Sequence, residues 1–259
     1  MKTLISFDVD MTLLDHATYK IPDSAMEAIE ALRKNHFIVL ATGRDMDTYY
    51  SRQYRDQIQA DAIIHSNGTK ITVGDQVLYE SVLPRELLER VLHFADAHDL
   101  AIGMTSGDDD YYIYPEHVTE HDIRRWGESG RQYKDPWKLL DMKVRTLAYI
   151  GVPEGAKLLE QEFPELKCPL FAGLEGADVI AKESSKANGL KILCEYFHIP
   201  VSETYAFGDS MNDLEILQEA GTGIAMGNAV PKLKEVADYV TDRIDENGIY
   251  NACKHFRLI

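Results

Sequence analysis

The sequence of 259 residues contains only three cysteines, and none of them forms a CxxC pair with another. An odd number of widely spaced cysteines argues against a disulfide framework or a zinc site, so we expect Cys168, Cys194 and Cys253 to be reduced thiols. Long apolar runs are also missing, because no stretch approaches the roughly 18 consecutive apolar residues of a membrane-spanning helix. The apolar run before Asp8 is too short for the core of a signal peptide. These absences predict a cytoplasmic protein without a membrane partner.

Positive charge is scarce: 27 lysines and arginines stand against 43 aspartates and glutamates, for a formal net charge of −16. No run of basic residues supplies a local patch, so we expect no binding to nucleic acid or to anionic membranes. The apolar share of 45% and the charged share of 27% are close to those of soluble globular proteins, which excludes a disordered, collagenous or coiled-coil chain. The length suits one large domain or two of modest size, and the composition leaves the oligomeric state open.

Short apolar runs alternate with amphipathic stretches near both ends of the chain, a pattern typical of an α/β fold. In these parts we predict a hairpin at 70–73 and 76–79 and buried strands at 4–7, 37–41, 62–65, 205–207, 223–226 and 239–240. Ser24 and Glu27 match a capping box, which predicts a helix with Ser24 as its N-cap.

The middle of the chain has a different pattern. The periodicity from 115 to 143 is poor, but around it we predict helices at 84–98 and 153–163 and strands at 100–105, 111–114, 146–150 and 178–181. The simplest organisation is a discontinuous α/β core of residues 1–82 and 183–259, with an α+β domain inserted at 83–182. We expect the core to be Rossmann-like, with a mainly parallel sheet between two layers of helices.

Polar residues follow three of the predicted core strands directly. In open α/β sheets, ligands bind outside the carboxyl ends of the strands, and there the sequence has Asp8 and Asp10, then Thr42 to Arg44, then Asp209. Asp8 and Asp10 are two apart on an extended segment, so they point to the same side. Two carboxylates this close repel each other, so a cation must neutralise them or one must hold a proton. Mg²⁺ is the natural counter-charge for such oxygen ligands.

Two further charged residues belong to this candidate site. Asp213 lies on the first turn of a predicted helix, where it either only caps the helix or also steadies the surroundings of a metal. Lys186 lies near the start of another helix, where the dipole disfavours a cation. It is therefore either a solvated surface lysine or a cation directed at the acidic residues and ready to meet a phosphate.

Four segments together resemble the motifs of the haloacid dehalogenase superfamily of phosphohydrolases: Asp8 to Thr12 (DVDMT), Thr42 to Arg44 (TGR), Lys186, and Gly208 to Asp213 (GDSMND). The segments His65 to Gly68 and Gly223 to Ala229 resemble the Cof-type subfamily. The inserted domain resembles the α/β (C2-type) cap of that subfamily, which supplies contacts for substrate specificity. The resemblance covers essentially the whole chain, and the order and spacing of the motifs make it specific.

The resemblance implies a Mg²⁺-dependent phosphatase that acts on a phosphate monoester of a small metabolite, either a sugar phosphate or a cofactor phosphate such as FMN or pyridoxal phosphate. Asp8 would be the nucleophile that forms an aspartyl-phosphate, and Asp10 the general acid and then base. Mg²⁺ would be held by the Asp8 carboxylate, the Asp10 backbone carbonyl and Asp209, with Asp213 supporting the catalytic site from the metal's outer shell. Lys186 would bind phosphate and offset negative charge.

The remaining motif residues would bind the phosphate or shape its surroundings. Thr42 would use its hydroxyl and its backbone amide, next to Gly43, and Asn212 its side-chain amide. The planar fork of Arg44 suits phosphate or a substrate carboxylate, with an ion pair to Asp45 or Asp47 as the alternative. In the inserted domain, the candidates for substrate contact are Met104, Tyr112, Arg124 and Arg125.

One residue departs from the family pattern, because Met11 stands where the family has glycine. A positive φ at this position would strain a methionine, so we expect φ to be negative and the usual glycine to serve for clearance. Two other functions stay open: a phosphosugar mutase or phosphotransferase with the same aspartyl-phosphate, and a non-catalytic sensor of phosphate or metal. A sensor would have no need of an acid at Asp10, which argues against it.

Overall fold

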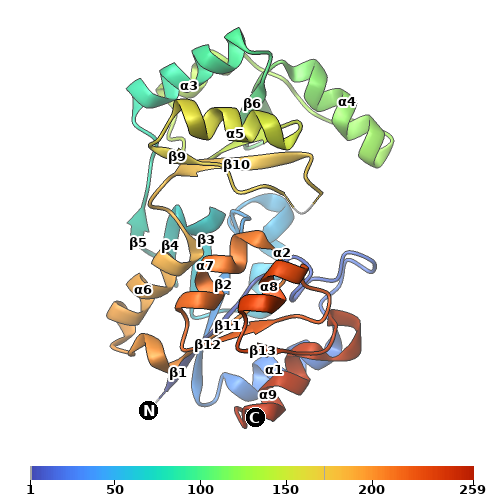
Figure 1. Cartoon of the computed structure of the whole chain (residues 1–259), viewed down its shortest axis with the longest axis vertical. Helices are drawn as coiled ribbons and strands as arrows, with labels where there is room; N and C mark the ends of the chain where they lie inside the picture. The colour runs from blue at the N-terminus through green and yellow to red at the C-terminus, as the bar shows by residue number, and fades with distance from the viewer. Residues whose placement is uncertain (1, 172) are drawn as a thin grey trace. The chain divides into compact units, whose positions relative to one another are not determined.

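The computed structural model describes residues 2–171 and 173–259. The chain forms two compact units (Figure 1): a core unit, Met1–Glu80 with Ser184–Ile259, and an inserted unit, Ser81–Glu183. Each unit has its own apolar core. Among the described helices, none combines the length and the apolar character needed to cross a membrane. The three cysteines are free and buried.

The core unit is built on an eight-stranded sheet whose strand order is β13-β12-β11-β1-β2-β3-β4-β5. The strands are β1 (Thr3–Phe7), β2 (His36–Ala41), β3 (Ala62–His65), β4 (Lys70–Val73), β5 (Gln76–Glu80), β11 (Thr204–Gly208), β12 (Thr222–Ala225) and β13 (Tyr239–Val240). All neighbours from β13 to β3 are parallel, and β4 and β5 are antiparallel. The parallel strands are continuous apolar runs because both faces of such a sheet are covered by helices.

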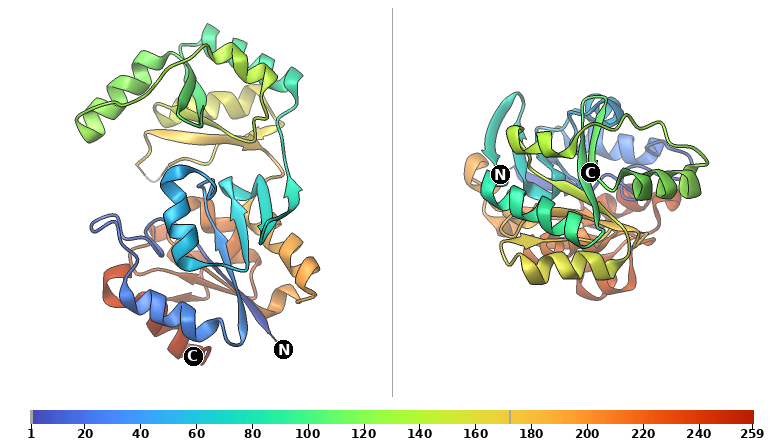
Figure 2. Two further views of the ribbon diagram at one scale, coloured as in Figure 1. Left: turned by 180° about the vertical axis from the view of Figure 1, so that it is seen from behind. Right: turned by 90° about the horizontal axis from the view of Figure 1, so that it is seen from above.

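Helices cover both faces of this sheet, which confirms the predicted three-layer core. Helices α6, α7 and α8 lie on one face, and α1 lies on the other with α9 beside it (Figures 1 and 2). The bounds are α1 (Asp23–Leu32), α2 (Tyr49–Ile58), α6 (Lys186–Phe197), α7 (Leu214–Glu219), α8 (Pro231–Val236) and α9 (Gly248–His255). Short 3-10 turns occur at Ser66–Gly68, Val201–Glu203, Met211–Asp213 and Ile244–Glu246.

The strand order places the end of β1 at the point where the chain changes direction. From β1 the chain proceeds to β2 and β3 on one side, whereas β11, β12 and β13 follow one another on the other side. Ligands bind at such a switch point in open α/β sheets, beyond the carboxyl ends of the strands. Asp8 and Asp209 directly follow β1 and β11, which are parallel neighbours.

The predicted capping box at the start of α1 is wrong. The helix begins at Asp23, with Pro22 as its N-cap and no side-chain cap. Ser24 therefore lies inside the first turn instead of before it. The Pro22 carbonyl accepts from the backbone N–H groups of Ala25 and Met26, and the fixed φ of proline directs the chain into the helix.

The inserted unit contains a five-stranded antiparallel sheet in the order β7-β6-β8-β10-β9. Its strands are β6 (Ala101–Ser106), β7 (Asp109–Ile113), β8 (Leu147–Ile150), β9 (Leu166–Lys167) and β10 (Gly176–Ala181). Helices α3 (Arg85–Ala97) and α5 (Pro153–Glu162) pack their apolar residues against the sheet. The segment of poor periodicity contains α4 (Pro115–Trp126) and a 3-10 turn, Pro136–Asp141, and α4 packs through Val118 on Ala101 and Tyr112.

Candidate active site

A buried lysine joins the ends of two core strands to the start of a helix. Lys186 is the first residue of α6, and its Nζ atom donates to Asp8 Oδ1 and to Asp213 Oδ1, both at 2.6 Å. The Lys186 side chain is 0% exposed, which excludes a solvated surface lysine. Burial would lower the pKa of Lys186, but the charges of Asp213 and Asp8 outweigh this and raise it. The structure therefore holds a fixed cation among the acidic residues.

Asp213 is held in place by the turn that follows β11. Its Oδ2 atom accepts from the backbone N–H groups of Asp209 (3.0 Å) and Ser210 (3.1 Å), while its Oδ1 atom accepts from Lys186. Ser210 and Asp213 thereby form a capping box at the start of the short helix. Both oxygens of Asp213 have protein partners, so this residue positions Lys186 and the Asp209 backbone.

The buried carboxylates fit a divalent cation. Carboxylate oxygens of Asp8, Asp209 and Asp213 all lie within 4.8 Å of one another. Asp8 uses Oδ1 for Lys186 and Asp209 uses Oδ1 for the Thr12 hydroxyl at 3.2 Å. Among the described residues, no donor is found for Asp8 Oδ2, for Asp209 Oδ2 or for the Asp10 backbone carbonyl. Hard oxygen atoms without protein donors are the ligands that Mg²⁺ takes.

The electrostatics of the metal-free site also favour a cation. Burial raises the pKa of Asp8, and the negative charges of Asp213 and Asp10 add to the effect against the opposing charge of Lys186. Burial likewise raises the pKa of Asp209, together with the charges of Asp8 and Asp213. One lysine does not balance three buried carboxylates, so the folded protein without a metal holds protons that a divalent cation would displace.

Asp10 lies outside this group and has its own partners. Its carboxylate accepts from Arg44 through two parallel bonds, Nε to Oδ2 at 2.7 Å and Nη2 to Oδ1 at 2.6 Å, and it contacts His16 Nε2 at 2.7 Å. Burial alone would raise the pKa of Asp10, but the hydrogen bonds from His16 and Arg44 hold it well below its usual range. Arg44 pairs with Asp10 in this structure, so the expected ion pair with Asp45 or Asp47 is wrong. The expectation that Arg44 binds phosphate or a substrate carboxylate stays a prediction.

Thr42, at the end of β2, supplies less than the sequence suggests. Its backbone N–H donates to the Ile64 carbonyl at 2.9 Å, as part of the sheet, so the expectation that this amide binds phosphate is wrong. The Thr42 hydroxyl accepts from Arg44 N–H at 3.0 Å and keeps its own proton to donate. A Cβ on Gly43 would lie 3.5 Å from the Asn67 side chain and 3.6 Å from that of Asn212. Because Gly43 has no side chain, its backbone lies open next to these two side-chain amides.

The Asn212 side chain is oriented by its neighbours. Its Oδ1 atom accepts from the Ser210 hydroxyl at 2.7 Å, and its Nδ2 atom donates to Asn67 Oδ1 at 3.0 Å. Asn67 lies in the 3-10 turn after β3 and is 3% exposed. The Asn67–Asn212 contact joins the loops after β3 and β11 next to Gly43.

The expectation of a negative φ at Met11 is wrong, because φ is +60°. Met11 N–H donates to the Leu14 carbonyl at 2.9 Å, and the Met11 carbonyl accepts from Asn228 Nδ2 at 2.8 Å. Asn228 in turn accepts from Ile244 N–H at 2.9 Å. The tight turn after Asp10 requires the left-handed conformation, which glycine adopts freely and methionine only at a cost of about 1–2 kcal/mol.

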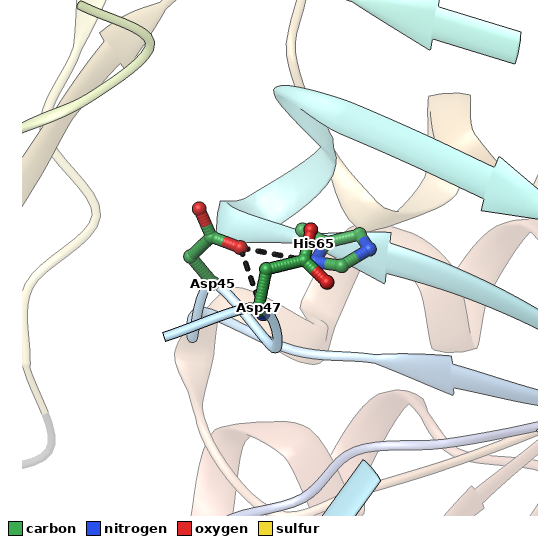
Figure 3. A group of neighbouring side chains, drawn as sticks. All are labelled: Asp45, Asp47 and His65. Atoms are coloured by element: carbon green, nitrogen blue, oxygen red, sulfur yellow. Dashed lines mark hydrogen bonds and ion pairs between the residues drawn. The ribbon is translucent and has the colours of Figure 1, made fainter. Parts of the chain in front are cut away.

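A second group of possible metal ligands, Asp45, Asp47 and His65, lies on the same unit (Figure 3). His65 Nδ1 accepts from Met46 N–H at 3.1 Å, and Asp45 Oδ1 accepts from Asp47 N–H at 3.1 Å. The two Asp47 oxygens pair with Arg55 and Lys70. Since protein donors occupy these atoms, the group is a hydrogen-bonded support for the loop after β2.

Sequence reasoning missed two residues, His16 on Asp10 and Asn228 on Met11, and no short motif signals either contact. In the inserted unit, the candidate residues have partners of their own. Tyr112 is buried beneath the Arg131 guanidinium, and burial raises its pKa to about 12. Arg124 and Arg125 lie 3.0 and 3.5 Å from the Glu175 carboxylate.

Comparison with known proteins gives this site a context. A model of the family of haloacid dehalogenase-like hydrolases matches residues 5–253. A protein of Bacillus subtilis strain 168 named "Putative phosphatase YkrA" is 32% identical over 259 residues, which cover 99% of this chain and 98% of the relative. The 5-amino-6-(5-phospho-D-ribitylamino)uracil phosphatase YcsE of the same strain is 29% identical, over 98% of this chain and 96% of its own. The solved structure of BT1666 from Bacteroides thetaiotaomicron, described among phosphatases of the haloalkanoate (HAD) superfamily, has a TM-score of 0.90 and 29% identity, and covers 100% of this chain and 96% of its own.

Proposed function

The chain belongs to the family of haloacid dehalogenase-like hydrolases and is a phosphohydrolase, and on this premise we propose that it hydrolyses phosphate monoesters of small metabolites through an aspartyl-phosphate on Asp8, with Mg²⁺ as cofactor. The observation that carries the proposal is the buried contact of Lys186 with Asp8 and Asp213, beside oxygens of Asp8 and Asp209 that have no protein donor. A relative acts on a phosphorylated ribitylaminouracil, which supports a metabolite ester as substrate.

In the first step, a carboxylate oxygen of Asp8 attacks phosphorus and the bond from phosphorus to the leaving oxygen breaks, while a proton from Asp10 passes to that oxygen. The Lys186 charge, 2.6 Å from Asp8 Oδ1, offsets the negative charge of nucleophile and phosphate together. The free proton of the Thr42 hydroxyl, the Gly43 backbone amide and the Asn212 amide are the donors for the phosphate oxygens.

In the second step, a water oxygen attacks phosphorus, Asp10 takes the proton of that water, and the bond to Asp8 breaks to release phosphate. The contacts with Arg44 and His16 hold Asp10 ionised, which is the form required here. The first step requires its protonated form, so the Asp10 carboxylate exchanges its Arg44 contact for the leaving oxygen when substrate binds.

Mg²⁺ is proposed to bind at Asp8, Asp209 and the Asp10 carbonyl, where it would neutralise charge on the nucleophile and the phosphate. Asp213, with both oxygens occupied, fixes Lys186 and the Asp209 loop and does not bind the metal directly. We assign to the inserted unit, as the cap, the contacts that select the substrate.

Phosphate release tests the proposal. Wild-type protein is incubated with p-nitrophenyl phosphate and a panel of metabolite phosphates, with Mg²⁺ and with EDTA, and free phosphate is measured. We expect release that requires Mg²⁺ and that falls by at least about a thousandfold in Asp8→Asn, because this variant keeps the shape and removes the nucleophile.

The matched control is Asp75→Asn, which removes an exposed carboxylate in the turn between β4 and β5 and should retain full activity. Product analysis in the presence of sugar alcohols separates hydrolysis from transfer to a second hydroxyl. Release that persists in Asp8→Asn, or that ignores Mg²⁺, would contradict the proposed mechanism.

A further inference from the structure

Two aromatic rings on the loop after β1 lie beside Asp10. His16 Nε2 is 2.7 Å from Asp10 Oδ1, and the rings of His16 and Tyr19 are stacked, with an interplanar angle of 15° and centroids 6.1 Å apart. The His16 side chain is 43% exposed and Tyr19 is 66% exposed. The pair therefore presents two flat rings to solvent next to Asp10.

The loop that carries these rings is closed on itself. The buried Asp15 accepts from Ala17 N–H at 2.8 Å and from the Thr18 hydroxyl at 3.2 Å. Backbone bonds join Tyr19 N–H to the Asp15 carbonyl at 2.7 Å and Asp15 N–H to the Lys20 carbonyl at 3.1 Å. The loop thus presents its rings on a hydrogen-bonded frame.

Core packing does not explain the position of Tyr19. Its φ is +53°, a left-handed conformation that a bulky residue rarely adopts, and its ring contributes little to the core because most of it is exposed. Residues in disfavoured backbone conformations cluster at active sites and ligand-binding sites.

We propose that His16 and Tyr19 form a stacking surface for the leaving group of the substrate, and that the preferred substrates are phosphate monoesters with a planar, conjugated ring close to the ester oxygen. This inference rests on the proposed function, in which Asp10 protonates the leaving oxygen. Lys186 and Thr42 would contact the phosphate. The leaving group, on the other side of the ester bond, would contact Asp10 and the His16 ring beside it. Flat rings stack on aromatic side chains without a need for complementary charge, which suits a strongly acidic protein.

The test compares benzyl phosphate with cyclohexylmethyl phosphate, because the two esters have similar size and alcohol leaving groups and differ in the flatness of the ring. Removal of the ring in Tyr19→Asn should lower kcat/KM for benzyl phosphate about 5- to 150-fold, the range of one ring stacked on an aromatic side chain. The same variant should lower kcat/KM for cyclohexylmethyl phosphate by a smaller factor, because a puckered ring buries less area on Tyr19 and cannot stack face to face. Asparagine tolerates the left-handed backbone, and Tyr19→Phe, which keeps the ring, should behave as wild type with both esters. Equal losses for both esters, or no loss for either, would overturn the stacking surface.

Binding separates this inference from the proposed function. Calorimetry with the Asp8→Asn variant measures the affinity of the two esters without turnover, and the same titration with Asp8→Asn combined with Tyr19→Asn tests the ring. A preference for benzyl phosphate that the Tyr19 change abolishes supports the stacking surface, and equal affinities refute it. If the wild type releases phosphate from neither ester nor from p-nitrophenyl phosphate, the proposed hydrolysis fails while the affinities still decide the stacking.

Discussion

Replacement of Lys186 by methionine should strongly destabilise the metal-free protein. Methionine keeps much of the side-chain length and removes the charge, so the buried carboxylates of Asp8 and Asp213 lose the cation at 2.6 Å. These side chains are 5% and 1% exposed, and water cannot replace the lost partner. Loss of one partner of a buried ion pair costs about 3–5 kcal/mol. For a chain of this size that corresponds to a fall in Tm of about 6–20 °C.

A second lysine on the same helix gives a matched control. Lys191 pairs with Glu219 at 2.8 Å, but the two side chains are 48% and 49% exposed. An exposed pair of this kind contributes about 0.2–1 kcal/mol, so Lys191→Met should lower Tm by no more than about 4 °C. The two substitutions are chemically identical, and the sites differ in burial and in the number of carboxylates that lose their partner, two for Lys186 and one for Lys191.

The loss in Lys186→Met should depend on pH. Burial already raises the pKa of Asp8, and the Lys186 charge opposes that rise. Without Lys186 the carboxyl takes up a proton more readily, and a protonated carboxyl no longer needs the cation. The loss should therefore be greatest at about pH 8 and smaller at about pH 5. Circular dichroism during thermal unfolding in EDTA measures both values. A loss equal to that of Lys191→Met, or one that does not change with pH, would refute this account of the site.

Three further results are expected. Asp8 and Asp209 have pKa values raised by burial, so the metal-free fold loses stability as pH rises from about 4 through these raised values. The increase in Tm on addition of Mg²⁺ should therefore be larger at about pH 8 than at about pH 5.5. An increase that shrinks as pH rises would contradict the assignment of the metal site. Burial raises the pKa of Cys168 to about 12, of Cys194 to about 11 and of Cys253 to about 12. At about pH 8 a thiol reagent should therefore modify the unfolded chain and leave the native chain almost unreacted. Fast labelling of the native protein would contradict this expectation. Met11→Gly should raise the free energy of unfolding by about 1 kcal/mol in urea titrations, because φ is +60°, whereas a loss of stability would show that contacts of the methionine outweigh the strain.

The apolar pattern predicts the parallel sheet well, since a buried strand such as β3, Ala62–His65, is apolar up to its last residue. It fails for helices whose packed face is polar. Helix α4 buries Val118 and Asp122, and the Asp122 carboxylate is held by Arg131 at 2.7 Å. A helix that buries a carboxylate leaves no regular apolar pattern in the sequence, so the sequence does not predict α4 within the segment from 115 to 143.

In the candidate site, the sequence predicts which residues take part better than it predicts which of them pair with one another. Position after a strand identifies Asp8 and Asp10 as a pair, and the resemblance to the haloacid dehalogenase motifs adds Lys186, whose position at the start of a helix leaves its role open. The pairing of Asp10 with Arg44, 34 residues later, depends on β1 and β2 being parallel neighbours in register. The positive φ of Met11 has one signal, the glycine that the family has at this position. The prediction is wrong because a bulky residue in this conformation is uncommon.

The two carboxyls of the first motif differ in a way that ties the resting site to its chemistry. Asp8 has a raised pKa because of burial, whereas the hydrogen bonds from His16 and Arg44 hold the pKa of Asp10 well below its usual range. In the proposed mechanism Asp8 must be ionised as the nucleophile and Asp10 must hold a proton as the general acid, so that mechanism needs the reverse order. A divalent cation held by Asp8 would lower the pKa of that carboxyl, and a phosphate that drew Arg44 away would raise the pKa of Asp10. We infer that the resting order is reversed by the two ligands together, so that the acid and the nucleophile are prepared only when metal and phosphate are both bound.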